Sequence, residues 1–161
     1  MTFATADSLN WTVRTAPLYA GTEHNMLQVP GKVAQVRDDN GEVLGITSPK
    51  YEVFQNDSLK RLILPHVEEG ILEITNMGYL GNGAKVFIQA RMAEEYTVAG
   101  ETHRASLTLL NSHDGSAALA AGVTDQRVIC SNTFSMAMTD MTTRLRHNLQ
   151  IHENALGISE I

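Results

Sequence analysis

The pattern that most limits the possible folds is a series of short alternating runs, separated by turn residues, within residues 71–124. In "KVFIQAR", residues 85–91, every second side chain is apolar on one face, which is typical of a half-buried strand. A second alternating run follows at residues 104–111. The sequence therefore predicts adjacent antiparallel strands near 84–92 and 104–111, joined through the turn at Ala99–Thr102, within a β-meander.

Directly after this meander the apolar spacing changes to that of a helix. The apolar residues fall at i, i+4, i+7, i+8 and i+11, which is one helix face: Cys130, Phe134, Ala137, Met138 and Met141. This predicts a helix over residues 127–138 that packs beneath the sheet. The fold class is therefore α+β, an antiparallel β-meander sheet with helices packed on one face.

The first part of the chain is predicted from local signals. Asn40-Gly41 lies between two short apolar runs and predicts a β-hairpin. Residues 57–69 have helical spacing, but Pro65 removes a backbone donor and should kink or divide that helix. The Gly, Asn and Pro content of residues 20–32 predicts a loop.

Size and composition indicate one domain, residues 1–161, with 43% hydrophobic residues. We see no apolar stretch of membrane-spanning length and no signal-peptide pattern at the N-terminus. With a single cysteine the expected location is the cytoplasm. The end at Ile161 lacks a cap, so we expect the natural chain to continue, or a partner to cover this end.

Three kinds of chemistry are weakly supported. A Cys/His hydrolase would use Cys130, His113 and Asn132, but Cys130 lies on the apolar stripe and points about 200° away from Asn132 on a helix. The six histidines lack zinc-site spacing. The Gly-rich residues 78–83 lack the Lys-Ser/Thr pair of a phosphate loop. We therefore expect a structural Cys130, no catalytic residue, no metal and no cofactor.

A nucleic-acid site is the more specific hypothesis. If the two strands pair, one face presents Lys85, Arg91 and Arg104 around Phe87. Cations that flank an aromatic ring are typical of a single-strand groove, because phosphates meet the charges and a base stacks on the ring. The surface would extend to Arg127, Arg144 and Arg146. Two facts oppose it: such a polar face is also the ordinary solvated side of a sheet, and the net charge is −6.

Several motifs in order resemble a known family. They are "SLNWTVRTAPLY", "VLGITSPKYEVFQN", "LTLLNSHDGSAALAAGVTDQRVICSNTF" and "RLRH". They look like the uncharacterised phage/plasmid-like proteins of the domain of unknown function 932 type. The resemblance implies an origin in phages and plasmids and no established activity. Members usually extend further at both ends, which leaves the oligomer contacts open.

The meander followed by a helix is similar in architecture to the core of single-strand annealing recombinases, the Rad and phage Red-beta type. Those proteins form rings or filaments and bind single-stranded DNA in a basic groove. The resemblance thus implies a homo-oligomer that binds or anneals single-stranded DNA in recombination or replication. An analogy of architecture is a weaker argument for function than residues at a site.

A second hypothesis comes from another class of protein. A small phage accessory protein would bind a host protein or a nucleotide, through a pocket or an acidic surface. Such a surface could comprise Glu68, Glu69, Glu73, Glu94 and Glu95. Salt-sensitive binding to single strands would favour the first hypothesis, and a bound nucleotide in the purified protein would favour the second.

Overall fold

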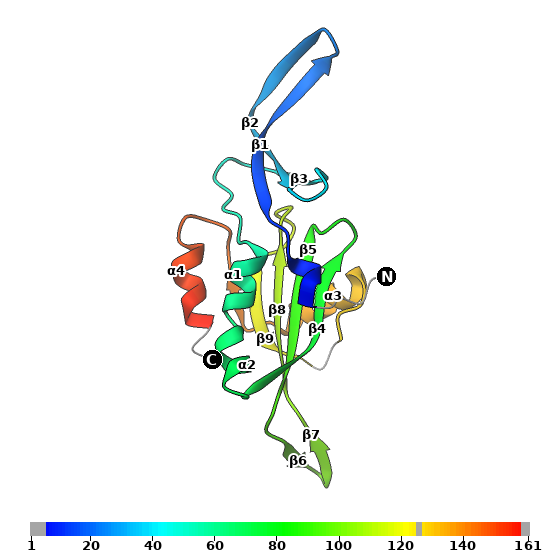
Figure 1. Ribbon diagram of the computed structural model, residues 1–161, viewed down its shortest axis with the longest axis vertical. Coiled ribbons are helices and arrows are strands. Elements are labelled where there is room, and N and C mark those ends of the chain that lie inside the picture. Colours follow the sequence, from blue (N-terminus) through cyan, green and yellow to red (C-terminus); the bar gives the residue numbers. More distant parts are fainter. Residues whose placement is uncertain (1–5, 125–126, 159–161) are drawn as a thin grey trace.

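A five-stranded antiparallel sheet forms the body of the protein in the computed structural model, which describes residues 6–124 and 127–158 (Figure 1). The strand order is β10-β9-β8-β5-β4. The strands are β4 (Leu72–Leu80), β5 (Lys85–Met92), β8 (Ser106–Ser112), β9 (Leu119–Val123) and β10 (Thr143–Leu145). Strands β4, β5, β8 and β9 pair antiparallel in succession. The α+β class and the meander are confirmed.

A smaller sheet comprises β1 (Val13–Thr22), β2 (Asn25–Arg37) and β3 (Val43–Thr47). The hairpin predicted around Asn40-Gly41 is confirmed, since both residues lie in the turn between β2 and β3 and Gly41 has a φ of 75°. The loop predicted for residues 20–32 is wrong. The pairing of β1 with β2 continues as far as the pair Thr22 and Asn25. Pro30 and Gly31 lie where the register of the two strands shifts. Turn residues there mark an irregularity within a ribbon.

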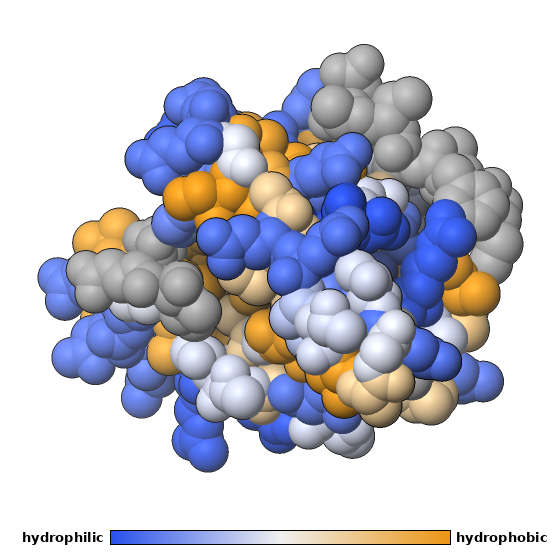
Figure 2. All heavy atoms as spheres, turned by 90° about the horizontal axis from the view of Figure 1, so that it is seen from below, coloured by the Kyte–Doolittle hydropathy of each residue, from blue (hydrophilic) through white to orange (hydrophobic). Residues whose placement is uncertain are grey.

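Two hairpins project from opposite ends of the molecule (Figure 1). One is the far part of β1 and β2, which we call the β1–β2 arm (residues 18–31). The other is β6 (Tyr96–Val98) with β7 (Glu101–His103), inserted between β5 and β8. Figure 2, which views this second end, shows mostly hydrophilic side chains with hydrophobic ones scattered among them.

The helices are short. They are η1 (Ala6–Leu9), α1 (Asn56–Arg61), α2 (Leu64–Glu68), α3 (Ser131–Asp140), α4 (Ile151–Ala155) and η2 (Leu156–Ile158). Pro65 lies in the first turn of α2, where its missing N–H costs little, so the predicted interruption is confirmed as a division into α1 and α2. Among the described residues, no helix has the length and apolar character needed to cross a membrane.

The first hydrophobic core lies between one sheet face and helices α1, α2 and α4. Val86, Ile88 and Ala90 of β5 are fully buried there. They meet Leu59 of α1 and Ile151 of α4, while Val67 of α2 packs at the margin. The predicted covering of one face by helices therefore holds for α1, α2 and α4.

A second, smaller core lies on the opposite face and belongs to α3. Phe134 and Ala137 of α3 contact Phe87 of β5 and Leu110 of β8, with Val128 beside them. Since successive residues of a strand point to opposite faces, Phe87 and Ile88 belong to different cores. Helix α3 thus covers only the part of this face near Phe87. The part near Arg91 is not covered by α3 and lines a pocket with polar walls.

Candidate functional site

A β-bulge in β4 begins the site. Ile74 and Met77 are three positions apart, yet both contact the first core. An extra residue must therefore be accommodated, and the register of β4 against β5 shifts between Ile74 and Asn76. In consequence both Thr75 and Asn76 turn to the opposite face, where they line a pocket. Bulges commonly re-aim side chains in this way next to functional sites.

The floor of this pocket is a buried polar network around Gln89 of β5. Gln89 is 4% exposed. Its Nε2 donates to Thr108 Oγ1 at 3.1 Å, and its Oε1 accepts from Asn76 Nδ2 at 3.1 Å and from the Val128 N–H at 2.9 Å. Asn76 Nδ2 also donates to the Val128 carbonyl at 2.8 Å. A buried amide needs such partners, and here they fix the geometry of the floor.

Two arginines lie at the edge of the pocket. The lining residues are Thr75, Asn76, Gln89, Arg91, Ser106, Thr124 and Arg127, around a volume of about 280 Å³. We call this the polar pocket. Gln89 and Thr124 are buried, whereas Arg91 and Arg127 are exposed. Arg91 makes no ion pair or hydrogen bond through its guanidinium with any described residue. The pocket therefore provides hydrogen-bonding groups and positive charge, a combination that suits a phosphorylated ligand.

The predicted role of Phe87 as an exposed stacking residue needs correction. Phe87 shares the predicted face with Arg91, but it is only 5% exposed and packs against α3. The alternation of polar and aromatic residues on this face predicts that the whole face is solvated. Helix α3 and Val128 cover the aromatic part instead, so Phe87 has no surface on which a base could stack.

None of the remaining predicted cations lines the polar pocket. Lys85 lies at the other end of β5, about 20 Å from Arg91 along the strand, and its Nζ lies 5.4 Å from the Phe134 ring centroid. Arg104 precedes β8 and pairs with Glu95 of the projecting hairpin. Arg144 donates to the Met138 carbonyl at 2.7 Å, and Arg146 is exposed beyond β10. Of the seven predicted residues, the pocket unites Arg91 and Arg127.

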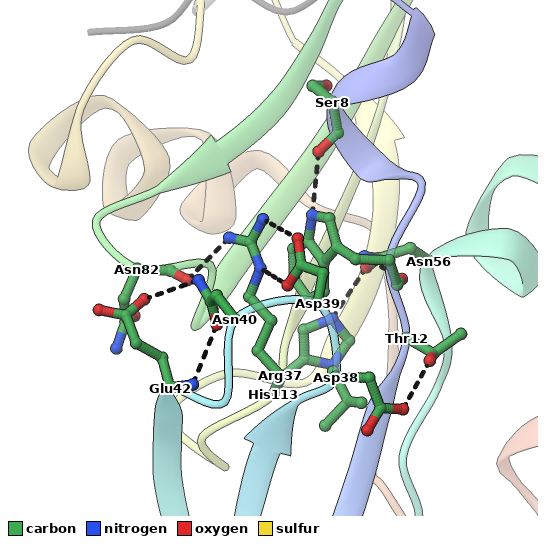
Figure 3. Close-up of polar contacts among 12 residues, drawn as sticks. Ser8, Thr12, Arg37, Asp38, Asp39, Asn40, Glu42, Asn56, Asn82 and His113 are labelled. Atoms are coloured by element: carbon green, nitrogen blue, oxygen red, sulfur yellow. Dashed lines mark hydrogen bonds and ion pairs between the residues drawn. The ribbon is translucent and has the colours of Figure 1, made fainter.

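The motif residues converge instead at the other end of β8, where Figure 3 shows Asn56 beside His113. His113 is fully buried, and its Nε2 lies 2.9 Å from Asn56 Oδ1. Asn56 Nδ2 donates to the Trp11 carbonyl at 3.1 Å, and the Trp11 and His113 rings meet edge to face. The pKa of His113 is lowered to about 4, mainly because the ring is buried and, to a smaller extent, because His147 is nearby. We call Trp11, Asn56, His113, Tyr51 and His147 the motif cluster.

Tyr51 and His147 form the other half of the motif cluster. Their rings stack with centroids 4.6 Å apart. The Tyr51 hydroxyl donates to the Ser112 carbonyl at 2.6 Å, and burial raises its pKa. Burial also lowers the pKa of His147, whose Nδ1 lies 2.9 Å from the Glu52 carbonyl. The cluster holds neutral, closely packed rings and joins the chain before α1 to the end of β8.

Arg37 connects the smaller sheet to this cluster (Figure 3). Its guanidinium lies over the rings of Trp11 and Tyr79, 4.2 and 4.7 Å from their centroids, and bonds Asp39 with two nitrogens. The same bonds to Asp39 raise the pKa of Arg37 and lower that of Asp39. This cation is fully used in holding β2 against β4, so it is not available to a ligand.

Cys130 occupies another position than the one predicted. It is the N-cap of α3, half-buried, and not a member of an apolar stripe. Its Sγ lies 3.5 Å from Thr133 Oγ1, and its N–H donates to that oxygen at 3.0 Å. Hydrogen bonds from Thr133 lower the pKa of the thiol. The predicted start of the helix at residue 127 is wrong, because residues 127–130 lie outside the helix, with Val128 held by Gln89.

No group of three His, Cys, Asp or Glu side chains suited to a metal occurs within residues 6–124 and 127–158. The sequence interpretation missed Thr75, Asn76, Ser106 and Thr124 as pocket residues. One signal was present: Thr75-Asn76 interrupts the alternation of "ILEITNMGYL" with two successive polar residues. Two polar residues together in an otherwise regular strand are compatible with a bulge.

Comparison with known proteins gives one match. The model of a family described as "Domain of unknown function (DUF932)" matches residues 43–159. Neither a curated protein nor a solved structure matches the chain. The matched range includes the whole polar pocket and every member of the motif cluster except Trp11.

Proposed function

Since the chain belongs to the DUF932 family, whose description names no activity, we propose a function from the site itself: the protein binds single-stranded DNA. The proposed setting is recombination or replication of phage or plasmid DNA in the cytoplasm, with the protein as a homo-oligomer. Arg91 and Arg127 hold backbone phosphates at the polar pocket. Single-strand annealing recombinases remain an analogy of architecture for this proposal.

The observation that carries the proposal is the meeting of two arginines from separate segments in one polar pocket. Arg91 ends the strand β5, and Arg127 precedes α3. The net charge of −6 opposes the approach of DNA to the chain as a whole. A local pair of guanidinium groups, one without an ion pair among the described residues, is therefore the place where a phosphate is best stabilised.

The test is fluorescence anisotropy with labelled single-stranded oligonucleotides at two salt concentrations. Arg91→Gln should weaken binding about tenfold, because a hydrogen-bonded charge is lost. The salt slope should fall by about 0.7 for each phosphate contact removed. Arg61→Gln is the matched control, since it removes the same charge from α1, whose packing is with the opposite sheet face.

Two results would end this proposal. The first is no detectable binding by the folded wild-type protein at low salt. The second is an equal loss of affinity in Arg91→Gln and Arg61→Gln, which would mean that binding follows net charge and not the polar pocket.

A second candidate function is binding to a host protein, and the β1–β2 arm favours it. Tyr19, Met26 and Leu27 of the arm are 51%, 54% and 66% exposed. Apolar side chains on a projecting ribbon are commonly contacts for another protein. A Leu27→Ser variant that binds single strands normally but loses a defined protein partner would assign this role to the arm.

A further inference from the structure

In the polar pocket, hydrogen-bond acceptors of β4 lie on one side and exposed arginines lie at the edge. This arrangement indicates the kind of ligand that the pocket binds. We propose that it holds one nucleotide of the strand with the base inside, and that it selects cytosine or adenine, which have an amino group at C4 or C6, over uracil or thymine, which have a carbonyl at C4. This inference rests on the proposed binding of single strands and adds a preference for base identity.

Asn76 supplies the main argument. Both protons of its amide are used, since Nδ2 donates to Gln89 Oε1 at 3.1 Å and to the Val128 carbonyl at 2.8 Å. These two acceptors fix which end of the amide is nitrogen. The oxygen Oδ1 therefore points away from them, and no described residue donates to it. A rigid, half-buried acceptor in a pocket calls for a donor on the ligand.

Thr75 repeats this arrangement on the adjacent position of the bulge. Its hydroxyl donates to the Gln89 carbonyl at 3.3 Å, so the proton is directed into the protein. The lone pairs of the oxygen are left on the pocket side. Two neighbouring side chains of β4 thus present acceptors, while the donors of the pocket include the two arginines and the hydroxyl of Ser106 on β8, which can take either role.

The depth of the groups gives the orientation of the ligand. Gln89 and Thr124 are 4% and 5% exposed at the floor, whereas Arg91 and Arg127 are exposed at the edge. An anionic phosphate is best placed at the exposed guanidinium groups, where charge need not be desolvated. The uncharged base then lies inward, against the half-buried Asn76, with the exposed Thr75 beside it.

The backbone of Val128 limits the pocket on the side of α3. Its N–H and carbonyl are both held by amide side chains of the floor, and its side chain packs with Phe87 and Phe134. A continuous strand cannot pass through this contact. One nucleotide turned out of the strand enters from the side of Arg91 and Ser106, in the way that proteins commonly read unstacked bases.

Cytosine and uracil differ at one position that this arrangement distinguishes. Cytosine has an amino group at C4, which donates to Asn76 Oδ1. Uracil has a carbonyl there, which places one acceptor against another and leaves both without a proton. A site built to bond a donor rejects the analogue that lacks it, because its own polar groups remain unpaired.

The experiment compares oligo(dC) with oligo(dU) of equal length on the wild-type protein by fluorescence anisotropy at neutral pH. We expect oligo(dC) to bind about five- to tenfold more tightly, the value of one hydrogen bond together with a removed repulsion. Equal affinities would overturn the inference while leaving the proposed function intact. Absence of binding to both would overturn the function as well.

Variants then locate the preference. In Asn76→Leu the ratio of the two affinities should fall close to one, and in Thr75→Val it should fall partly, whereas Thr75→Ser keeps the hydroxyl and the ratio. Because both oligonucleotides are compared on the same protein, a partly unfolded sample lowers both affinities alike. A ratio unchanged in Asn76→Leu would refute the assigned acceptor.

Free nucleotides separate a strand-bound base from a soluble ligand. Competition by dCMP, with dUMP as the matched control, should displace oligo(dC) weakly and in the same order of preference. If dCMP instead binds as tightly as the oligonucleotide, the ligand of the pocket is a free nucleotide and not a strand.

Discussion

The two ends of β8 have opposite relations to solvent. Ser106, at its start, lines the polar pocket, whereas Asn111 and His113, at and just after its end, belong to the buried region around the motif cluster. In the cluster the side chains bond one another and the backbone. In the pocket exposed arginines surround a fixed polar floor. The motif residues that meet in the cluster thus hold the structure together, while the groups available to a ligand come from β4, β5, the start of β8 and the segment that includes Thr124 and Arg127.

Removal of the Trp11 side chain should disrupt the motif cluster and leave the polar pocket intact. The ring is 7% exposed and contacts Arg37, Tyr79 and His113. Trp11→Ala should lower the free energy of unfolding by about 3–5 kcal/mol, since it leaves a large cavity. Urea denaturation followed by circular dichroism measures this. The affinity of the folded fraction for single strands should not change.

Trp11→Phe serves as the control for this prediction, because it keeps a ring beside Arg37 and should cost less. If Trp11→Ala costs under about 1 kcal/mol, the cluster does not support the fold as described. If it abolishes binding in a sample that is still folded, the two regions are not separate in function.

Acid should weaken the motif cluster through His113. The folded-state pKa is about 4, below the ordinary 6.5, because burial disfavours the charged ring. The unfolded chain therefore binds a proton near pH 6.5 that the folded protein accepts only near pH 4. Stability from this group is complete above pH 6.5 and is lost as the pH falls toward 4, by up to about 3 kcal/mol. The lowered pKa of His147 acts in the same direction.

The measurement is the free energy of unfolding from urea titrations between pH 7.5 and pH 4, as the difference between wild type and His113→Gln. The variant lacks the titrating ring, so its stability should depend less on pH in this window. Parallel curves for the two proteins would show that His113 does not contribute to the acid sensitivity.

The local patterns of the chain predicted much of the fold and little of the site. Period-two alternation is set by the pleat of a strand, so the prediction of neighbouring strands near 84–92 and 104–111 is confirmed by the pairing of β5 with β8. The same pattern says which residues share a face, but not what covers that face. Phe87 and Gln89 both point to the side of α3, and only tertiary packing decides that one is core and the other pocket floor.

The bulge and the arm show the same limit in β-structure. The bulge at Thr75-Asn76 arises because Ile74 and Met77 must both be buried in the first core. That core is made of residues distant in the sequence. The β1–β2 arm has no buried face for most of its length, so no alternation marks it as a strand. In both cases the decisive contacts are between segments and not within one.

The smallest expected effect concerns Cys130, a motif residue at the start of α3 and outside both regions. Thr133 Oγ1 accepts from the N–H of Cys130 and of Ile129, at 3.0 and 2.9 Å, and so completes the start of α3. Thr133→Val removes this capping oxygen and should cost about 1 kcal/mol of stability. The backbone N–H of Thr133 and then its hydroxyl lower the pKa of the Cys130 thiol. The variant keeps the first bond and loses the second, so it should also have somewhat less thiolate at neutral pH. Labelling of the native protein with a thiol reagent should then slow by about twofold.

Thr133→Ser keeps the hydroxyl and should label at the wild-type rate. Faster labelling in Thr133→Val, with unchanged circular dichroism, would mean that access to the sulfur, and not the hydrogen bonds from Thr133, controls its reactivity.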